Sequence, residues 1–273
     1  MEAVTYMIVF VFGAIIGSFL NVVIYRLHTG KSTRGRSHCL SCGRPLVWFE
    51  LMPILSYALL RGYCRTCHAH IPIRYLFVEI LTGGLFVFAW YMFLGDVFVL
   101  VLHFILLSLL VVVLLYDMRH TIIPDEAVWG LTLSALALAL YSSNAQGLWL
   151  PVFFHIGAGL LASAFFASLW YISRGRWMGL GDAKLALPLG ILTGPTGALG
   201  MIVLSFWIGA AIMLPLMAVQ WFLHTGTTRL RYFKTPLRMK SEVPFAPFLI
   251  IAFFVVYFFH VDVLTIIAAL TSA

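Results

Sequence analysis

The uncharged run VFVLVLHFILLSLLVVVLLY, residues 97–116, decides the class of fold. About 20 apolar residues suffice for a helix to cross a bilayer, and runs of this kind recur along the chain. The 273 residues are 62% hydrophobic and only 10% charged, whereas a soluble domain has roughly 45–50% apolar and 25% charged residues. The composition therefore excludes a soluble globular protein. The runs do not alternate as the roughly ten-residue strands of a membrane β-barrel do, so we expect an all-α polytopic membrane protein.

The distribution of positive charge predicts the number of membrane crossings. The 17 Lys and Arg residues fall in four segments, and the positive-inside rule assigns such segments to the cytoplasm. Turn-forming residues at 142–147 and 193–197 divide two uncharged runs that are too long for one span. About eight transmembrane helices, with both ends of the chain outside, then bring all the basic segments to one face. The basic segments are 26–74, residue 119, 174–184 and 229–240, and the expected helices are about 3–25, 74–94, 97–116, the two parts of 127–173, 183–192, a longer helix up to 223, and 243–269.

We expect three parts along the chain. Residues 1–26 form a first transmembrane helix, which has no Lys or Arg before it and is longer than the core of a signal peptide, so we expect it to be retained. Residues 27–73 form a small cytoplasmic loop domain, and residues 74–273 form a membrane core of about seven helices. A loop of this size cannot build a sufficient hydrophobic core and needs a staple.

All four cysteines lie in this loop, as the C-x-x-C pairs Cys39/Cys42 and Cys64/Cys67. Two such pairs are typical of a tetrahedral zinc site, because each short spacer lets a turn of backbone point two thiolates at one ion. Two disulfides are the alternative, but a cytoplasmic compartment keeps thiols reduced. Four thiolates leave no open coordination position, so the zinc is expected to fold the loop and to take no part in catalysis.

Two aspartates stand where a charge is unfavourable, at predicted helix ends. Asp117 directly follows the run 97–116, and Asp182 closes the sequence Gly179-Leu180-Gly181-Asp182 at the start of a later helix. The expected topology brings both to the cytoplasmic boundary. Two neighbouring carboxyls share a proton, so that one activates water while the other polarises a carbonyl, which is the chemistry of an aspartic peptidase. A capping role at a helix N-terminus is the structural alternative for Asp182.

Other polar residues receive simpler interpretations. Asp125 and Glu126 follow a proline and suit the first turn of a helix. Lys184 either tunes the aspartate pair or lies at the membrane interface, and the second is the simpler reading. For His103 and His155, in the middle of predicted spans, we expect a polar partner on another helix.

The chain resembles the type IV prepilin peptidase family of GxGD-type aspartic peptidases. The resemblance covers most of the chain and consists of modest motifs in a specific order. They are residues 17–27 (GSFLNVVIYRL), both C-x-x-C pairs, 53–57 (PILSY), 60–64 (LRGYC), 73–75 (IRY), 79–83 (EILTG), 117–125 ending in IPD, and 179–184 (GLGDAK).

The resemblance implies a function and its site. The family's catalytic aspartates match Asp117 and Asp182. The family removes the basic leader from type IV prepilins or type II secretion pseudopilins at the cytoplasmic face of the bacterial inner membrane. Many members then methylate the new N-terminal residue, usually phenylalanine, with S-adenosylmethionine, an activity associated with the cysteine-containing loop. We therefore expect prepilins and the lipid bilayer as partners, and no nucleic acid.

Two residues depart from the family's pattern, and a third has two possible roles. Ala246 stands where the family commonly has glycine, and Leu51 where it frequently has asparagine, in the loop linked to methylation. Glu79, at the inner end of the second span, either pairs with Arg74 or contacts the methyl donor, and we expect the ion pair.

The alternative function is that of a proton- or cation-coupled transporter. Asp117 and Asp182 would then form an ion relay, and the zinc loop would be a docking module. A relay of this kind lies near the middle of the bilayer, whereas the expected topology puts both carboxylates at one edge. A nucleic-acid-binding module is disfavoured because the eight basic residues of segment 26–74 are widely spread.

Overall fold

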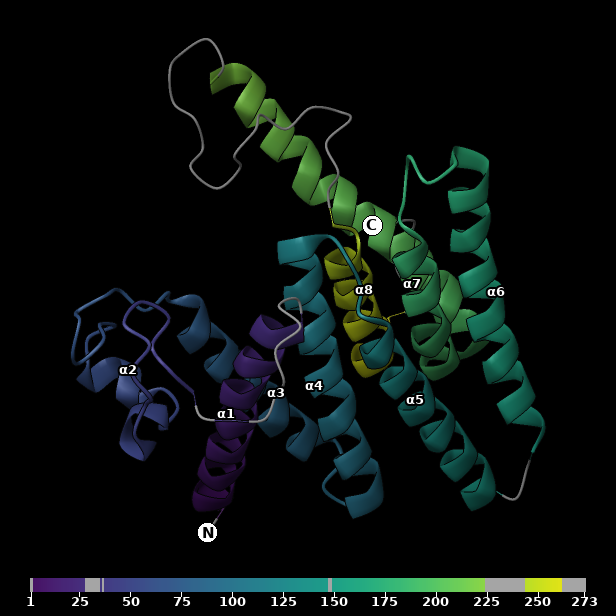
Figure 1. Cartoon of the computed structure of the whole chain (residues 1–273). Coiled ribbons are helices and arrows are strands. Elements are labelled where there is room, and N and C mark those ends of the chain that lie inside the picture. The colour runs from purple at the N-terminus through teal and green to yellow at the C-terminus, as the bar shows by residue number, and fades with distance from the viewer. Residues whose placement is uncertain (1, 28–34, 36, 147–148, 224–243, 262–273) are drawn as a thin grey trace. The chain divides into compact units, whose positions relative to one another are not determined.

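The computed structural model describes residues 2–27, 35, 37–146, 149–223 and 244–261 (Figure 1). Within these ranges the chain is almost entirely helical, with two isolated β-bridges and no strand. The expected all-α membrane class is thus confirmed. The chain divides into two compact units, Met1–Leu115 and Tyr116–Ala273, with the boundary inside one helix.

The first unit is built on two closely packed helices, α1 (Glu2–Leu27) and α3 (Arg74–Met92). A Cβ atom added at Gly13 would lie 2.9 Å from the Cα of Gly83, so the contact requires glycine on α1. The ring of Phe86 on α3 stacks on that of Phe104, on α4 (Val97–His120), with 4.2 Å between the ring centroids. Between membrane helices the hydrophobic effect gives no driving force, so close contacts of small residues and aromatic rings hold the helices together.

The cysteine-containing loop connects α1 to α3. Its helical elements are the 3-10 turn η1 (Trp48–Leu51) and the short helix α2 (Leu55–Leu59). The two β-bridges, His38 with Pro45 and Tyr63 with His70, each close a small hairpin around one C-x-x-C pair.

The second unit contains α5 (Asp125–Gln146), α6 (Leu150–Ser173), α7 (Leu180–Leu223) and α8 (Ala246–Phe259). Helix α7 packs on α5, α6 and α8. A Cβ at Gly190 on α7 would lie 2.8 Å from the Cα of Gly159 on α6, so these two glycines allow α6 and α7 to pack closely. The last turn of α4 also belongs to this unit.

Helix α7 is interrupted at Gly194, whose backbone is non-helical (φ 69°, ψ −175°). The predicted break at 193–197 therefore exists, although helix continues on both sides of it. The Nδ1 atom of His155 on α6 lies 2.7 Å from the carbonyl oxygen of Ile191, just before the break. His155 thus has the expected partner on another helix, and the Nδ1 atom of His103 lies 2.7 Å from the carbonyl oxygen of Val99 on its own helix.

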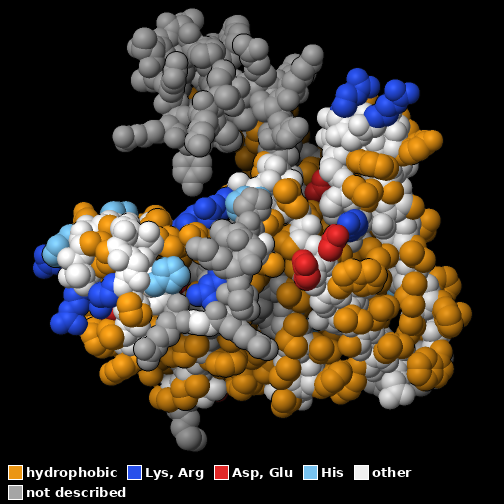
Figure 2. Space-filling model, viewed as in Figure 1, with side chains coloured by type: hydrophobic (Ala, Val, Ile, Leu, Met, Phe, Trp, Pro, Cys, Tyr) orange, Lys and Arg blue, Asp and Glu red, His pale blue; other side chains and the backbone are white. Residues whose placement is uncertain are grey.

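Among the described residues, five helices are long and apolar enough to cross a membrane: α1, α3, α4, α6 and α7. Hydrophobic side chains accordingly cover much of the visible helix surface in Figure 2. Helix α8 is apolar but has only 14 residues, and α5 is less apolar, so the count of eight spans stays a prediction. The basic segment 229–240 and the end of the predicted helix 243–269 lie outside the described residues. Two boundaries differ from expectation, because α4 continues to His120 and α5 to Gln146.

Candidate functional site

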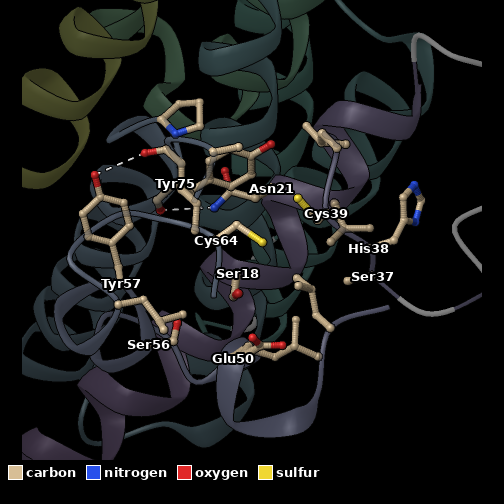
Figure 3. Close-up of a pocket in the computed structure, with 18 of the residues that line it drawn as sticks. Ser18, Asn21, Ser37, His38, Cys39, Glu50, Ser56, Tyr57, Cys64 and Tyr75 are labelled. Atoms are coloured by element: carbon tan, nitrogen blue, oxygen red, sulfur yellow. Dashed lines mark hydrogen bonds between the residues drawn. The ribbon is translucent and has the colours of Figure 1, made fainter. Parts of the chain in front are cut away.

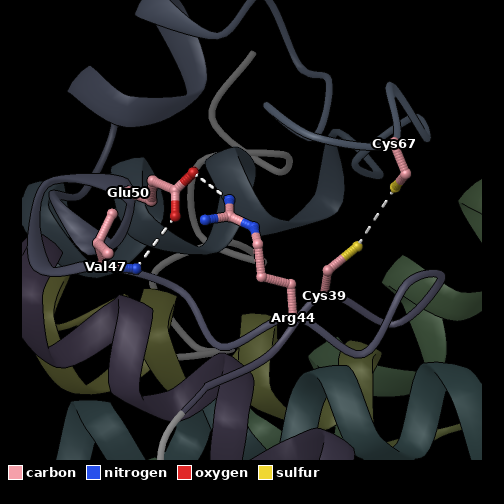
Figure 4. A network of polar contacts seen from close by, with 5 residues as sticks. All are labelled: Cys39, Arg44, Val47, Glu50 and Cys67. Carbon is pink, nitrogen blue, oxygen red and sulfur yellow. Dashed lines mark hydrogen bonds and ion pairs between the residues drawn. The ribbon is translucent and has the colours of Figure 1, made fainter.

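The four cysteine Sγ atoms converge, all within 4.8 Å of one another. The Sγ atoms of Cys39 and Cys67, one from each pair, are 3.8 Å apart (Figure 4). Thiolates at about 2.3 Å from a tetrahedral zinc ion are about 3.8 Å apart. The cluster can therefore hold a metal ion, and its dimensions fit zinc.

The two C-x-x-C segments fold in the same way. In each, the N–H of the first cysteine donates to the carbonyl five residues later, Arg44 or Ala69, at 2.9 Å. The N–H of the fourth residue after that cysteine, Gly43 or His68, returns to the cysteine carbonyl. Both of these residues have positive φ. The sequence thus builds two equivalent turns, each of which presents two thiols.

Backbone amides favour the thiolate at the first cysteine of each C-x-x-C pair. The N–H groups of Cys67 and Thr66 lower the pKa of Cys64 to about 6. Those of Cys42 and Ser41 likewise lower the pKa of Cys39 below its usual value. The thiolate is the metal-binding form of cysteine, so these amides favour the ligand state.

An ion pair connects η1 to the turn that carries Cys39 and Cys42. The Nη2 atom of Arg44 lies 2.6 Å from Oε1 of Glu50, whose Oε2 accepts the N–H of Val47 at 3.0 Å (Figure 4). Burial alone would raise the pKa of Glu50, but the Val47 N–H and the Arg44 guanidinium outweigh it and leave the pKa below its usual value. Glu50 is therefore charged at neutral pH and holds the loop together.

The two predicted catalytic aspartates meet in the second unit. Asp117 lies in the last turn of α4 and Asp182 in the first turn of α7, and they are only 4% and 7% exposed. Their carboxyl groups are close enough to interact electrostatically. The backbone N–H of Ala246, at the start of α8, donates to Asp117, while Oδ2 of Asp117 has no hydrogen-bond partner among the described residues. A buried carboxylate oxygen of this kind is unusual, and a catalytic role is one of its known explanations.

The glycines before Asp182 explain how it reaches this position. A Cβ at Gly181 would lie 3.2 Å from Cβ of Ile123, so the start of α7 packs tightly on the segment after α4. The carboxylate of Asp182 accepts the backbone N–H of Gly179, and its own N–H donates to the Gly179 carbonyl at 3.3 Å. The G-x-G-D sequence thus forms a compact turn that carries the aspartate inward.

Neighbouring charged residues do not join this pair. The side chain of Asp125 is 59% exposed and forms an ion pair with Lys184 at 2.7 Å. Lys184 is therefore engaged on the surface, which fits the simpler of its two interpretations. The sequence did not identify the Ala246 N–H as a functional group, because every residue except proline has a backbone N–H.

One expected ion pair was wrong. Glu79 accepts the N–H of Ile54 at 2.8 Å and a hydrogen bond from Ser18, while the Arg74 guanidinium lies over the ring of Tyr75. Glu79 is drawn toward the loop because the backbone of Ile54 approaches the start of α3. The sequence alone does not reveal this long-range contact.

A polytopic helical protein with a buried carboxylate pair in one unit and a four-thiol cluster in the other has the make-up of a membrane-embedded peptidase. The sequence model of the bacterial peptidase A24 N-terminal domain matches residues 11–93, and that of the type IV leader peptidase family matches residues 104–214. The chain belongs to the type IV leader peptidase family.

Bacterial relatives carry the name prepilin leader peptidase/N-methyltransferase. The protein of Myxococcus xanthus is 35% identical, over 74% of this chain and 60% of the relative. That of Xanthomonas campestris is 31% identical, over 92% and 90%, and that of Klebsiella pneumoniae 34%, over 68% and 83%. No solved structure matches the chain. The matches identify a peptidase with methyltransferase activity and give the transporter alternative no support.

Proposed function

We propose that Asp117 and Asp182 are the catalytic pair that removes the leader from prepilins or pseudopilins. The observation that carries the proposal is the meeting of two buried aspartates from distant helix ends, one with an unpartnered oxygen, in a chain of the leader peptidase family. Methylation of the new N-terminus then follows, with S-adenosylmethionine as the source of the methyl group.

The pair acts as an acid and a base. Two neighbouring carboxyls cannot both ionise readily, so they share one proton. The ionised member takes a proton from water as the water oxygen attacks the scissile carbonyl. The protonated member donates a hydrogen bond to the carbonyl oxygen and then gives its proton to the leaving amine. The Ala246 amide orients Asp117 and leaves its Oδ2 free for the water.

The neighbouring charges support a site at the cytoplasmic face of the bacterial inner membrane. Arg119 follows Asp117 closely, Lys184 follows Asp182, and Arg174 and Arg176 lie just after the end of α6. Basic residues at helix ends are typical of the cytoplasmic side. The basic leader of a prepilin would be cut there, while its apolar helix stays in the bilayer.

The cysteine cluster is proposed to hold structural zinc through Cys39, Cys42, Cys64 and Cys67. The bound metal would join the two cysteine turns through one ion. The three parts 1–26, 27–73 and 74–273 then have separate tasks, as first helix, zinc-stapled loop domain and peptidase core.

The test is co-expression with a prepilin in membranes, followed by mass spectrometry of the pilin N-terminus. Wild type should remove the leader and add about 14 Da of methyl mass. Asp117→Asn and Asp182→Asn should slow cleavage by about 10²–10⁴-fold, the range of acid–base catalysis. Asp125→Asn is the matched control, because that carboxylate is exposed and paired with Lys184. Normal cleavage by either of the first two variants would remove that aspartate from the mechanism.

A further inference from the structure

The first unit contains a cavity of about 230 Å³ between α1, the cysteine-containing loop and α3. Its wall combines Ser18 and Asn21 of α1, Tyr57 of α2, and Tyr75 and Glu79 of α3. Figure 3 shows Ser18, Tyr57 and other lining side chains around one hollow, with Asn21 and Tyr75 along one edge and Ser56 and Glu50 along the opposite edge. The cavity lies wholly within this unit, so it is a site separate from the aspartate pair.

Glu79 gives the cavity a buried carboxyl group that forms no ion pair among the described residues, although Arg26 and Arg65 also line the wall. The side chain is 8% exposed, and its partners are the N–H of Ile54 and the hydroxyl of Ser18. Glu50, the other acid of the wall, is paired with Arg44. A buried carboxylate is stable when an opposite charge or sufficient donors compensate it. Glu79 therefore offers a cationic ligand a carboxyl group that is in no ion pair with a described residue.

The rest of the wall suits an organic cation with a flat ring. Tyr25, Tyr57 and Tyr75 all contribute to it. Aromatic faces attract cations and stack on nucleobases. The hydroxyl of Tyr57 donates to the Ile71 carbonyl at 3.3 Å, which fixes the position of that ring.

The metal cluster is part of the same wall. Cys39 and Cys64, the first cysteine of each C-x-x-C pair, both line the cavity. The two turns that carry them therefore shape the hollow as well as the metal site. This links the cysteine-containing loop to ligand binding by direct contact.

We propose that this cavity binds S-adenosylmethionine and that Glu79 faces its sulfonium group. The assignment rests on the proposed methyltransferase activity, for which it names a site. In the reaction, the methyl carbon leaves sulfur, which keeps the bonding electron pair, and bonds to the N-terminal amine, which releases a proton to water. The spent donor is a neutral thioether, so the charge of Glu79 distinguishes donor from product.

Binding of S-adenosylmethionine and S-adenosylhomocysteine to the full chain in detergent, measured by calorimetry, tests the proposal. The wild type should prefer the cationic donor by about tenfold, the scale of one partly screened charge contact. Glu79→Gln keeps the size of the side chain and its acceptor for the Ile54 N–H. It should bind the two ligands with nearly equal affinity. Glu126→Gln, an exposed acid on α5, should keep the wild-type preference.

A second pair of variants tests the location without changing charge. Ser56→Trp should fill the cavity and weaken both ligands by about tenfold or more. Ala58→Trp adds the same ring to α2 at an exposed residue that does not line the cavity, and should leave both affinities unchanged. Bound zinc and leader cleavage, measured on the same preparations, report whether each variant is folded.

The outcomes separate this proposal from the function on which it rests. If the wild type methylates pilin but Ser56→Trp and Glu79→Gln bind both ligands normally, the cavity assignment is wrong and the methyltransferase activity stands. If the wild type cleaves the leader but neither binds the donor nor methylates, both the methyltransferase activity and the cavity assignment fail.

Discussion

The two units of the chain hold their polar groups in opposite ways. In the first unit, each cysteine turn closes on itself through backbone bonds that span no more than five residues. In the second, Asp117 and Asp182 come from the ends of different helices, and the amide that orients Asp117 belongs to a third. A site made of local turns can be recognised from the sequence around it. A site made by helix packing can be recognised only through its individual residues.

The two sites also depend on different sources of stability. The thiol cluster is formed by a small loop, so its order is coupled to metal binding. The aspartate pair depends on close helix contacts, such as Gly159 with Gly190 and Gly181 with Ile123. A substitution in one unit should therefore leave the site of the other unit functional. Four predictions test this independence.

The largest expected effect separates the two activities by one substitution. Asp182→Asn should lower the rate of leader cleavage by about 10²–10⁴-fold. It should still methylate a synthetic peptide with an already mature N-terminus at the wild-type rate. Rates measured on the two substrates check this. If methylation of the mature peptide falls in parallel, the two regions do not work independently.

The converse substitution is Cys64→Ser in the loop. It removes one ligand of the proposed zinc site, so metal content should fall below one ion per chain. Methylation should drop at least about tenfold. Mutation of a residue that only supports a metal ligand already costs about 10–100-fold in metal affinity or activity, and Cys64 is itself a proposed ligand. Leader cleavage should stay within about threefold. Elemental analysis and the two assays give the result, and full metal content in the variant would contradict the proposed ligand set.

A packing change in α6 should disturb only the second unit. In Gly159→Ala the new Cβ would meet Ile191 and Leu187 at 2.6 Å, and such overpacking destabilises by about 1–3 kcal/mol. The unfolding midpoint and cleavage should both fall, while zinc content is kept. Gly157→Ala is the matched control on the same helix, because its Cβ would meet nothing within 4 Å. Equal behaviour of the two variants would contradict the close contact.

The smallest effect concerns Glu50 and pH. Its folded pKa lies below the usual value, so its contribution to stability is present above the unfolded pKa of about 4.3 and is lost as pH falls through the folded pKa. Glu50→Gln should therefore unfold at a slightly lower temperature than the wild type at pH 7. The difference should shrink as the pH falls below about 4.3 and vanish below the folded pKa of Glu50. A series of thermal unfolding curves from pH 7 into acid measures it. If the difference grew in acid, the folded pKa of Glu50 could not lie below its unfolded value, and the prediction would be wrong.

Several features could be predicted without coordinates, and others could not. The break in α7 was predicted from residues 193–197, because glycine and proline act locally. The pairing of Glu79 with Arg74 was wrong, because sequence proximity on a helix does not show that Ile54 approaches from the loop.

The sequence by itself determined the membrane class, the four-cysteine loop and the two candidate aspartates. Each of these depends on composition or short spacing, which act over a few residues. Only the tertiary structure decided that Ala246 donates to Asp117, that Glu79 accepts the N–H of Ile54, and that two cysteines line a cavity with three tyrosines. These contacts join residues far apart in the chain, and the close packing of helices, not local preference, selects which polar groups meet.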